Sequence, residues 1–263
     1  MVDFTSSADQ CELLADLLWA MGVVAIEERS TDPSVITLRT SMGEDPTDAI
    51  NAVHTAFPSV TTQIVGVPRS VADTWRSHAT ATWINDSVAL VPAWVQAPDN
   101  SNPIYIEPLD TFGLGNHPTT VLALRLALNT VASGSVVIDV GCGSGVLAIS
   151  LARLKNCSAS VFDIAESARG AVAANAELNN VSNVVWVEHW QELRADAVLA
   201  NILAPVLKAE ASSIQSSVTV GGFVVLSGMR TEQVEDVLNH FTLCQETSRD
   251  TLEGWTAVVL QKN

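Results

Sequence analysis

The feature that most constrains the fold is an apolar segment followed by a glycine-rich turn and a helical pattern. Residues 136–140 read Val-Val-Ile-Asp-Val, a composition typical of a strand buried on both faces of a sheet. Gly141, Gly143 and Gly145 follow, and a helix is expected over 146–155. Glycines let the backbone approach a ligand closely, and the N-terminus of a helix offers free N–H groups. The segment therefore predicts a ligand site at a strand-to-helix turn.

The spacing of the glycines narrows the class of ligand. A nicotinamide-binding turn reads G-x-G-x-x-G, whereas this chain reads G-x-G-x-G and has Val146 where the last glycine would stand. An acid, Asp139, lies two residues before the first glycine. This pattern favours S-adenosylmethionine, which has an amino-acid end and no pyrophosphate. A tight turn with incidental glycines is the alternative.

Strand and helix patterns alternate from about residue 104 onward, which predicts a mostly parallel α/β sheet. The last two strand patterns, 242–247 and 255–261, have no helix between them and are expected to pair as an antiparallel hairpin. In an open sheet of this kind, ligands bind beyond the carboxyl ends of the parallel strands.

Two polar residues are expected at that edge of the sheet. Asp163 comes 22 residues after Gly141, at the end of a strand expected over 159–162, where a carboxylate can accept hydrogen bonds from ribose hydroxyls. Asn201 follows a strand expected over 197–200, and its amide oxygen could accept a hydrogen bond from an amino nucleophile. A solvated loop aspartate and a helix-capping asparagine are the structural alternatives.

The first 68 residues predict a separate small unit. Strand and helix patterns occur in the order β-α-β-β-α-β, with the second strand expected over 23–26, and this order is typical of a ferredoxin-like α+β domain. The unit contains 10 acidic and 2 basic residues, a net charge of −8. Such acidity suits a domain that recognises a basic partner, or it serves solubility alone.

These patterns predict a ferredoxin-like substrate-recognition domain at 1–68, a linker at 69–100 and an α/β domain at 101–263. Around the linker we expect a helix over 71–83, a strand over 88–92 and a loop over 97–103.

Charge and cysteine usage exclude several classes of protein. The net charge is −16 with only three lysines, which argues against a direct nucleic-acid partner because phosphate binding needs clustered basic side chains. The N-terminus lacks a signal-peptide pattern, and the longest uncharged run, 211–229, is too polar for a membrane span. The four cysteines have no metal-ligand spacing. We expect a reduced cytoplasmic protein with no metal site and no membrane partner.

Four segments resemble a known family. They are Phe112-Gly113-x-Gly115-x-His117-Pro118-Thr119-Thr120, the glycine motif 139–145, Asp163, and Asn201-Ile202-Leu203-Ala204. Together they resemble the ribosomal protein L-eleven lysine methyltransferase family, class I enzymes that use S-adenosylmethionine and act on the stalk-base protein of the large ribosomal subunit. Most class I methyltransferases share the glycine motif, whereas the first and last segments are far more specific.

The resemblance implies a role for each matching residue. The implied cofactor-binding residues are Phe112, Gly113, Thr120, Asp139, Gly141, Gly143, Asp163 and Asn201. Asn201 is also the implied catalytic residue, because it would face the methyl acceptor. The family's small N-terminal domain is likewise ferredoxin-like and binds the protein substrate. The chain departs from the family at Leu114, where a Thr is usual, and at Ala165, where a second Asp is usual.

The expected reaction is methylation of lysine and/or N-terminal amines of the stalk-base protein. His117, Glu188 and His189 are candidates for a base that deprotonates the amine, and loss of the proton to water is the alternative. Two rival functions stay open. One is methylation of another protein or of a small molecule, and the other is cofactor-dependent regulation without turnover. The sequence does not fix the oligomeric state.

Overall fold

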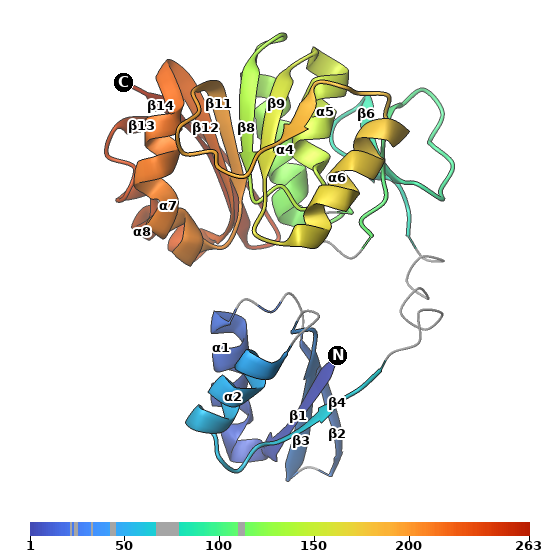
Figure 1. Ribbon diagram of the computed structural model, residues 1–263, viewed down its shortest axis with the longest axis vertical. Helices are drawn as coiled ribbons and strands as arrows, with labels where there is room; N and C mark the ends of the chain where they lie inside the picture. Colours follow the sequence, from blue (N-terminus) through green and yellow to red (C-terminus); the bar gives the residue numbers. More distant parts are fainter. Residues whose placement is uncertain (22, 24–25, 33, 43–45, 67–78, 110–113) are drawn as a thin grey trace. The chain divides into compact units, whose positions relative to one another are not determined.

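The computed structural model describes residues 1–21, 23, 26–32, 34–42, 46–66, 79–109 and 114–263. The chain divides into two compact units, Met1–His78 and Ala79–Asn263 (Figure 1). In the described ranges, no helix is both long enough and apolar enough to cross a membrane.

In its described residues, the first unit is a four-stranded antiparallel sheet with two helices. Its elements are β1 (Val2–Ser7), α1 (Ala8–Ala20), β2 (Ile26–Asp32), β3 (Val35–Thr40), α2 (Thr47–Ala56) and β4 (Thr61–Ile64), and the strand order is β2-β3-β1-β4. Phe4, Leu14, Leu38 and Val53 are buried in its core. The element order is that of the predicted ferredoxin-like domain.

One predicted boundary in this unit is wrong. The sequence predicts the second strand over 23–26; Val23 is not in a strand, 24–25 lie outside the described residues, and β2 runs from Ile26 to Asp32 through mostly exposed polar residues. At the edge of the sheet, β2 is held by backbone pairing, from Ile26 opposite Thr40 to Asp32 opposite Val35. Pairing of this kind leaves no alternating apolar signal in the sequence.

The second unit contains a seven-stranded sheet of order β10-β9-β8-β11-β12-β14-β13. The strands are β8 (Val136–Val140), β9 (Ser158–Phe162), β10 (Val184–Trp186), β11 (Ala195–Asn201), β12 (Val218–Arg230), β13 (Cys244–Leu252) and β14 (Trp255–Lys262). The first five strands are parallel, and β14 runs antiparallel to β12 and β13. The α/β fold with an antiparallel C-terminal hairpin is confirmed.

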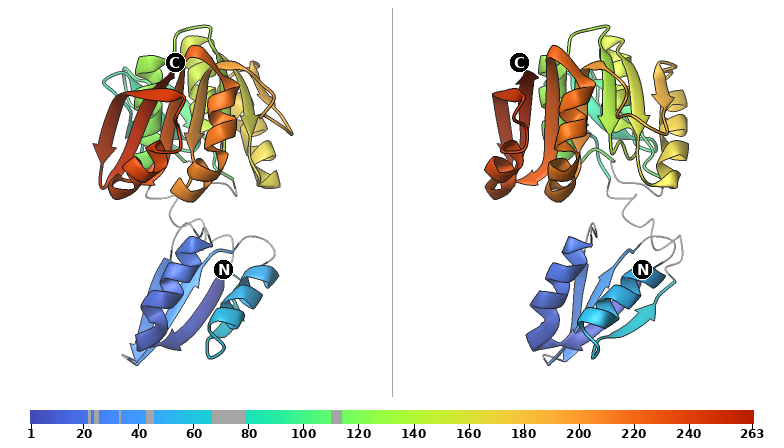
Figure 2. Two further views of the ribbon diagram at one scale, coloured as in Figure 1. Left: turned by 90° about the vertical axis from the view of Figure 1, so that its left-hand side faces the viewer. Right: turned by 60° about the vertical axis from the view of Figure 1, so that its left-hand side comes forward.

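Helices cover both faces of this sheet. They are α4 (Pro118–Thr130), α5 (Val146–Lys155), α6 (Glu166–Leu178), α7 (Ala204–Ser217) and α8 (Val234–Leu238). Val137 and Leu199 pack with α4 and α5, whereas the alternate residues Ile138 and Val198 pack with α7 and α8. In Figure 2, α4 (green) and α7 (orange) lie on opposite sides of the sheet. Burial of both faces explains the nearly continuous apolar strands.

A smaller sheet of β5 (Thr82–Trp83), β6 (Val88–Pro92) and β7 (Asn102–Ile106) joins the same core. Leu90, Ile104 and Ile106 pack in the cluster that contains α4 and α5. The expected strand over 88–92 is confirmed as β6. Two expectations need correction. A helix was expected over 71–83, but the last residues of that range form strand β5, and its first part lies outside the described residues. A loop was expected over 97–103, but this range overlaps β7, which pairs in parallel with β6.

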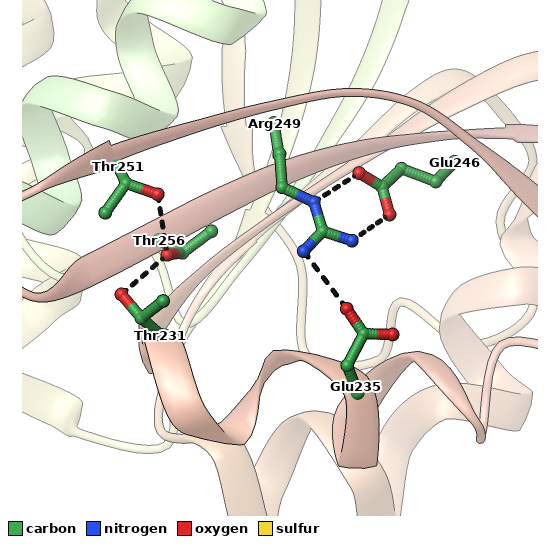
Figure 3. Close-up of polar contacts among 6 residues, drawn as sticks. All are labelled: Thr231, Glu235, Glu246, Arg249, Thr251 and Thr256. Carbon is green, nitrogen blue, oxygen red and sulfur yellow. Dashed lines mark hydrogen bonds and ion pairs between the residues drawn. The ribbon is translucent and has the colours of Figure 1, made fainter.

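The C-terminal hairpin is tied to the preceding segment by polar contacts (Figure 3). The buried hydroxyl of Thr256 lies 3.0 Å from the hydroxyls of both Thr231 and Thr251. Nearby, the Arg249 guanidinium binds two carboxylates, which raises its pKa further above the usual range. These carboxylates belong to Glu246 on the same strand and Glu235 on α8. The contacts fix the hairpin beside the end of β12.

Candidate functional site

The carboxyl ends of three parallel strands lie at one level. Val140 of β8 is opposite Phe162 of β9 on one side and Ala200 of β11 on the other. The residues that follow, Gly141, Asp163 and Asn201, are therefore brought to one edge of the sheet although 60 positions separate the first from the last. This is the edge at which open α/β sheets bind ligands.

The glycine turn is held against the end of β9 by its own backbone. The N–H groups of Gly141 and Cys142 both donate to the carbonyl of Phe162, at 2.8 and 3.0 Å. Gly141, Gly143 and Gly145 have φ values of +72°, +53° and +77°, which L side chains rarely adopt. Gly145 is the N-cap of α5, so the first N–H groups of that helix border the turn.

Asp163 holds the other side of the glycine turn through hydrogen bonds. One carboxylate oxygen accepts the N–H of Gly143 at 2.8 Å, and the other accepts the N–H of Ala165 at 2.9 Å. Ala165 is the N-cap of α6 and its side chain makes no cap bond, so Asp163 ties the turn to the residue at which α6 begins. Each oxygen keeps capacity for a further donor.

Asp139 is a buried acid beneath the turn, with 1% of its surface exposed. Its Oδ2 accepts the N–H of Ala148 at 3.2 Å, while its Oδ1 has no hydrogen-bond partner among the described residues. Burial raises the pKa of this carboxyl to about 7; the Ala148 N–H opposes that rise, and the negative charge of Asp163 adds to it. An unpartnered buried oxygen is suited to a cationic ligand group.

Asn201 lies at the end of β11 beside the first turn of α4. Its Nδ2 donates to the hydroxyl of Thr120 at 3.4 Å, and Thr120 is fully buried. Ser227, opposite Asn201 on β12, donates its hydroxyl hydrogen to the carbonyl of Thr119 at 2.9 Å. Helix α4 is thus bound to the ends of two strands, and the direction of the Asn201 amide is set by Thr120.

The turn after Asn201 is packed between two glycines. A Cβ atom at Gly141 would lie 2.2 Å from Cγ2 of Ile202, and one at Gly228 would lie 2.3 Å from the Ile202 carbonyl oxygen. Both positions therefore require glycine for steric reasons. Ile202 in this way fixes the spacing between the glycine turn and the end of β12.

His117 has a structural task. It is the N-cap of α4, and its Nδ1 lies 2.8 Å from the Thr119 hydroxyl and 3.3 Å from the Thr119 amide nitrogen. Its ring packs edge-on against Trp255 at 5.1 Å, and Arg230 covers the same tryptophan at 4.0 Å. Burial, followed by the charge of Arg230, lowers the pKa of His117 below its usual value.

The other candidate bases stand in exposed positions. Glu188 forms an ion pair with Arg169 at 3.0 Å, and both side chains are more than half exposed. His189 is exposed as well. Burial also raises the pKa of the Cys142 thiol, which disfavours the nucleophilic thiolate form. In the part of the chain that the structure describes, no cluster of three or more His, Cys, Asp or Glu residues could hold a metal ion.

The structure therefore brings together six of the eight residues predicted for the cofactor site, namely Thr120, Asp139, Gly141, Gly143, Asp163 and Asn201. The other two, Phe112 and Gly113, lie outside the described residues. Sequence reasoning missed Gly228 and Ser227, because only the neighbouring turn and helix reveal their task. Leu114 is half-buried, and Ala165 occupies the N-cap position of α6 without a side-chain cap bond.

Comparison with known proteins gives a consistent result. A family model described as "Ribosomal protein L11 methyltransferase (PrmA)" matches residues 11–263. A "Ribosomal protein L11 methyltransferase" of Chromobacterium violaceum is 31% identical over 245 residues, which cover 92% of this chain and 79% of the relative. One of Oceanobacillus iheyensis is 30% identical over 201 residues, covering 73% of this chain and 64% of the relative. The chain thus spans just under two thirds of the length of some of these relatives.

A solved structure shares the fold. It is titled as a ribosomal protein L11 methylase from Lactobacillus delbrueckii subsp. bulgaricus, and it superimposes with a TM-score of 0.64 at 24% identity. The match covers 70% of this chain and 98% of that chain. It confirms the class I methyltransferase fold of the second unit.

The packing of Ile202 predicts unequal effects of two glycine substitutions. Gly134 has a φ of +80° and nothing within 4 Å of a Cβ position, so Gly134→Ala should lower the free energy of unfolding by about 1–2 kcal/mol through backbone strain alone. Gly228→Ala adds a clash with the Ile202 backbone and should lower it by about 1–3 kcal/mol more. Urea unfolding followed by circular dichroism measures both, and equal losses would contradict the close approach.

The burial of Asp139 predicts a pH dependence of stability. Its pKa is about 7 when folded and 3.8 as an ordinary value, so the folded state binds more protons between these limits. Its contribution should therefore lower the free energy of unfolding as the pH rises from about 4 to about 7, by up to about 4 kcal/mol. Asp139→Asn should remove that slope. Parallel curves of unfolding free energy against pH for the two proteins would contradict the assignment.

Proposed function

The chain belongs to the ribosomal protein L11 methyltransferase family, and from that premise we propose that it methylates lysine and/or N-terminal amines of the ribosomal stalk-base protein, L11, using S-adenosylmethionine. The observation that carries the proposal is the convergence of Asp139, the glycine turn, Asp163 and Asn201 at one edge of the sheet. A ribosomal substrate would meet the enzyme in the cytoplasm.

The residues at this edge fit the proposed cofactor. S-adenosylmethionine supplies a methyl group on a positively charged sulfur, together with an amino-acid end and a ribose. The unpartnered oxygen of Asp139 suits the ammonium of the amino-acid end, directly or through water, and the backbone of Gly141 and Gly143 allows close approach. The oxygens of Asp163 suit the ribose hydroxyls. Phe112 and Gly113 stay predictions from the family resemblance.

We assign to Asn201 the orientation of the acceptor amine. Because its Nδ2 donates to Thr120, its Oδ1 is left to accept an N–H of the incoming amine. An amine held this way can direct its lone pair toward the methyl carbon. Positioning of two reactants can supply several kcal/mol of the acceleration. No described side chain needs to form a covalent bond in this scheme.

The amine must be neutral before it can attack. A lysine with an ordinary pKa of about 10.4 loses its proton at pH 7 at a free-energy cost of about 4.6 kcal/mol, and an α-amino group near 7.8 at about 1 kcal/mol. His117 is occupied as the cap of α4, and Glu188 pairs with Arg169. We therefore favour loss of the proton to water over a dedicated protein base.

The first unit is the proposed recognition domain for the protein substrate. Residues 1–68 contain two basic residues, and both are paired with acids: Arg39 binds Asp3 at 2.6 Å, and Arg29 binds Glu27 at 2.9 Å. The remaining acids give residues 1–68 a net charge of −8, and Glu28 and Asp32 are exposed. A ribosomal protein that binds RNA is expected to be basic, so the charges complement each other.

A methyl-transfer assay with an Asn201 variant tests the activity. We expect labelled S-adenosylmethionine to transfer methyl groups to purified L11, seen as steps of one methyl in the intact mass. Asn201→Ala should retain cofactor binding within about threefold but lower the transfer rate about 100-fold, because the amine loses its alignment. Asn239→Ala, at an exposed position on the end of α8, is the matched control and should transfer at the normal rate.

The same assay separates the rival functions. If the protein binds the cofactor and methylates another protein or a small molecule but not L11, the proposed substrate is wrong and the proposed methyl-transfer reaction stands. Cofactor binding without transfer to any acceptor would favour a regulatory protein. Absence of cofactor binding would overturn the proposal as a whole.

The acidic unit predicts a salt-dependent interaction with the substrate. The KM for L11 should rise about tenfold between 50 mM and 500 mM salt, because screening weakens attraction between exposed charges. Glu27→Gln combined with Glu28→Gln should raise this KM about threefold at low salt. Glu177→Gln combined with Glu210→Gln removes the same charge from the second unit and should not raise it. A KM that is flat with salt would contradict recognition by charge.

A further inference from the structure

We propose that Asn175 is a positioning residue that couples strand β7 to the glycine turn, an inference that rests on the proposed cofactor site. Asn175 is on α6, is fully buried and has no side-chain hydrogen bond to Asp163 or Asn201. It links a backbone group after β7 to the carbonyl of Ser144 inside the turn. Neither the glycine motif nor the methyltransferase reaction accounts for such a link.

Helix α6 pairs with the free edge of β7 through two side-chain amides. Asn175 accepts the N–H of Glu107 at 2.8 Å and donates to its carbonyl at 2.9 Å. One turn later, Asn179 accepts the N–H of Tyr105 at 2.9 Å and donates to its carbonyl at 2.6 Å. Each side-chain amide therefore makes the two hydrogen bonds that a residue of a neighbouring strand would make.

The repeat lengths of helix and strand explain why this pairing is possible. Four residues of helix rise about 6 Å, and two residues of strand rise about 6.6 Å. Residues 105 and 107 point their N–H and C=O groups to the same edge, while Asn102 and Ile106 bond on the β6 side, to Ser87 just before β6 and Ala93 just after it. Two asparagines four residues apart can thus form hydrogen bonds with the backbone N–H and C=O groups on the edge of β7 that does not pair with β6.

Only Asn175 extends the pairing into the cofactor turn. Its Nδ2 also donates to the Ser144 carbonyl at 3.0 Å, and Ser144 is fully buried between Gly143 and Gly145. Asp163 holds Gly143 from the other side at 2.8 Å. The turn is thereby held at two consecutive residues, once from β9 and once from α6. The second N–H of the Asn179 side-chain amide donates instead to the backbone carbonyl of Asn175.

This difference makes the two asparagines a matched pair for experiment. Asn175→Ala and Asn179→Ala each remove a two-bond contact with β7, so both should lower the melting temperature by a similar amount. Only Asn175→Ala also removes the hydrogen bond to the Ser144 carbonyl. It should raise the Kd and the KM for S-adenosylmethionine about tenfold while changing kcat less than twofold. Asn179→Ala should keep both constants within twofold of the original protein.

A second readout needs no cofactor. Hydrogen exchange of the unliganded protein should be faster at the amides of 142–145 in Asn175→Ala than in Asn179→Ala, with similar increases at 105–107 in both. Asn175→Asp keeps the side-chain volume and one acceptor while removing both donated bonds, so it serves if the alanine variant does not fold. Titration calorimetry measures the Kd, and mass spectrometry measures the exchange.

The outcomes are distinct. Weaker cofactor binding and faster exchange of the turn in the Asn175 variants alone support the coupling. Equal effects in the two positions, or none in either, overturn it. If the unsubstituted protein does not bind S-adenosylmethionine, the proposed function fails, and the exchange comparison still decides whether Asn175 holds the turn.

Discussion

The parallel hydrogen-bond ladder that joins β9, β8 and β11 sets the position of every polar group in the candidate site. It ends the three strands at the same level, so that Gly141, Asp163 and Asn201 emerge at one edge. A slip by one residue would reverse the faces of a strand and move each apolar side chain from the cluster it fits to the one on the other side of the sheet. The two hydrophobic clusters on either side of the sheet therefore maintain the register on which the site depends.

Steric contacts position the turns of the candidate site that lie beyond the ends of the strands. Ile202 lies against Gly141 through its side chain and against Gly228 through its backbone, at distances that leave no room for a Cβ atom. The turn proposed to bind the cofactor and the turn proposed to face the acceptor are thus fixed relative to each other by direct packing. Hydrogen bonds from Asn201 to Thr120 and from Ser227 to the Thr119 carbonyl then hold α4 at the same place. A rigid arrangement of this kind suits a reaction whose rate depends on alignment.

The parts of the fold that could be predicted are those governed by local pattern and chain order. The strand before Gly141, the position of Asp163 and the C-terminal hairpin all follow from periodicity and spacing. Strand β2 differs from the prediction because backbone pairing stabilises it and leaves no apolar repeat. The first residues of β7, Asn102 and Pro103, have the composition of a loop, and their place in a strand follows only from pairing with β6. Gly228 acquires its role only from Ile202. Asn175 and Asn179 do leave a signal, since they continue the buried face of α6 that begins with Ala168 and Ala171.

Electrostatics connects the stability of the fold with its proposed function. Asp139 is buried with one unsatisfied oxygen and feels the negative charge of Asp163, so its ionised form is unfavourable in the unliganded protein. A cationic group bound beside it would lower its pKa and recover the free energy that burial costs. The same carboxyl that weakens the fold near neutral pH would then strengthen binding of the ammonium end of the cofactor. Its placement at the end of β8 makes sense as preparation for a cationic ligand, whereas a core residue chosen for stability alone would be apolar.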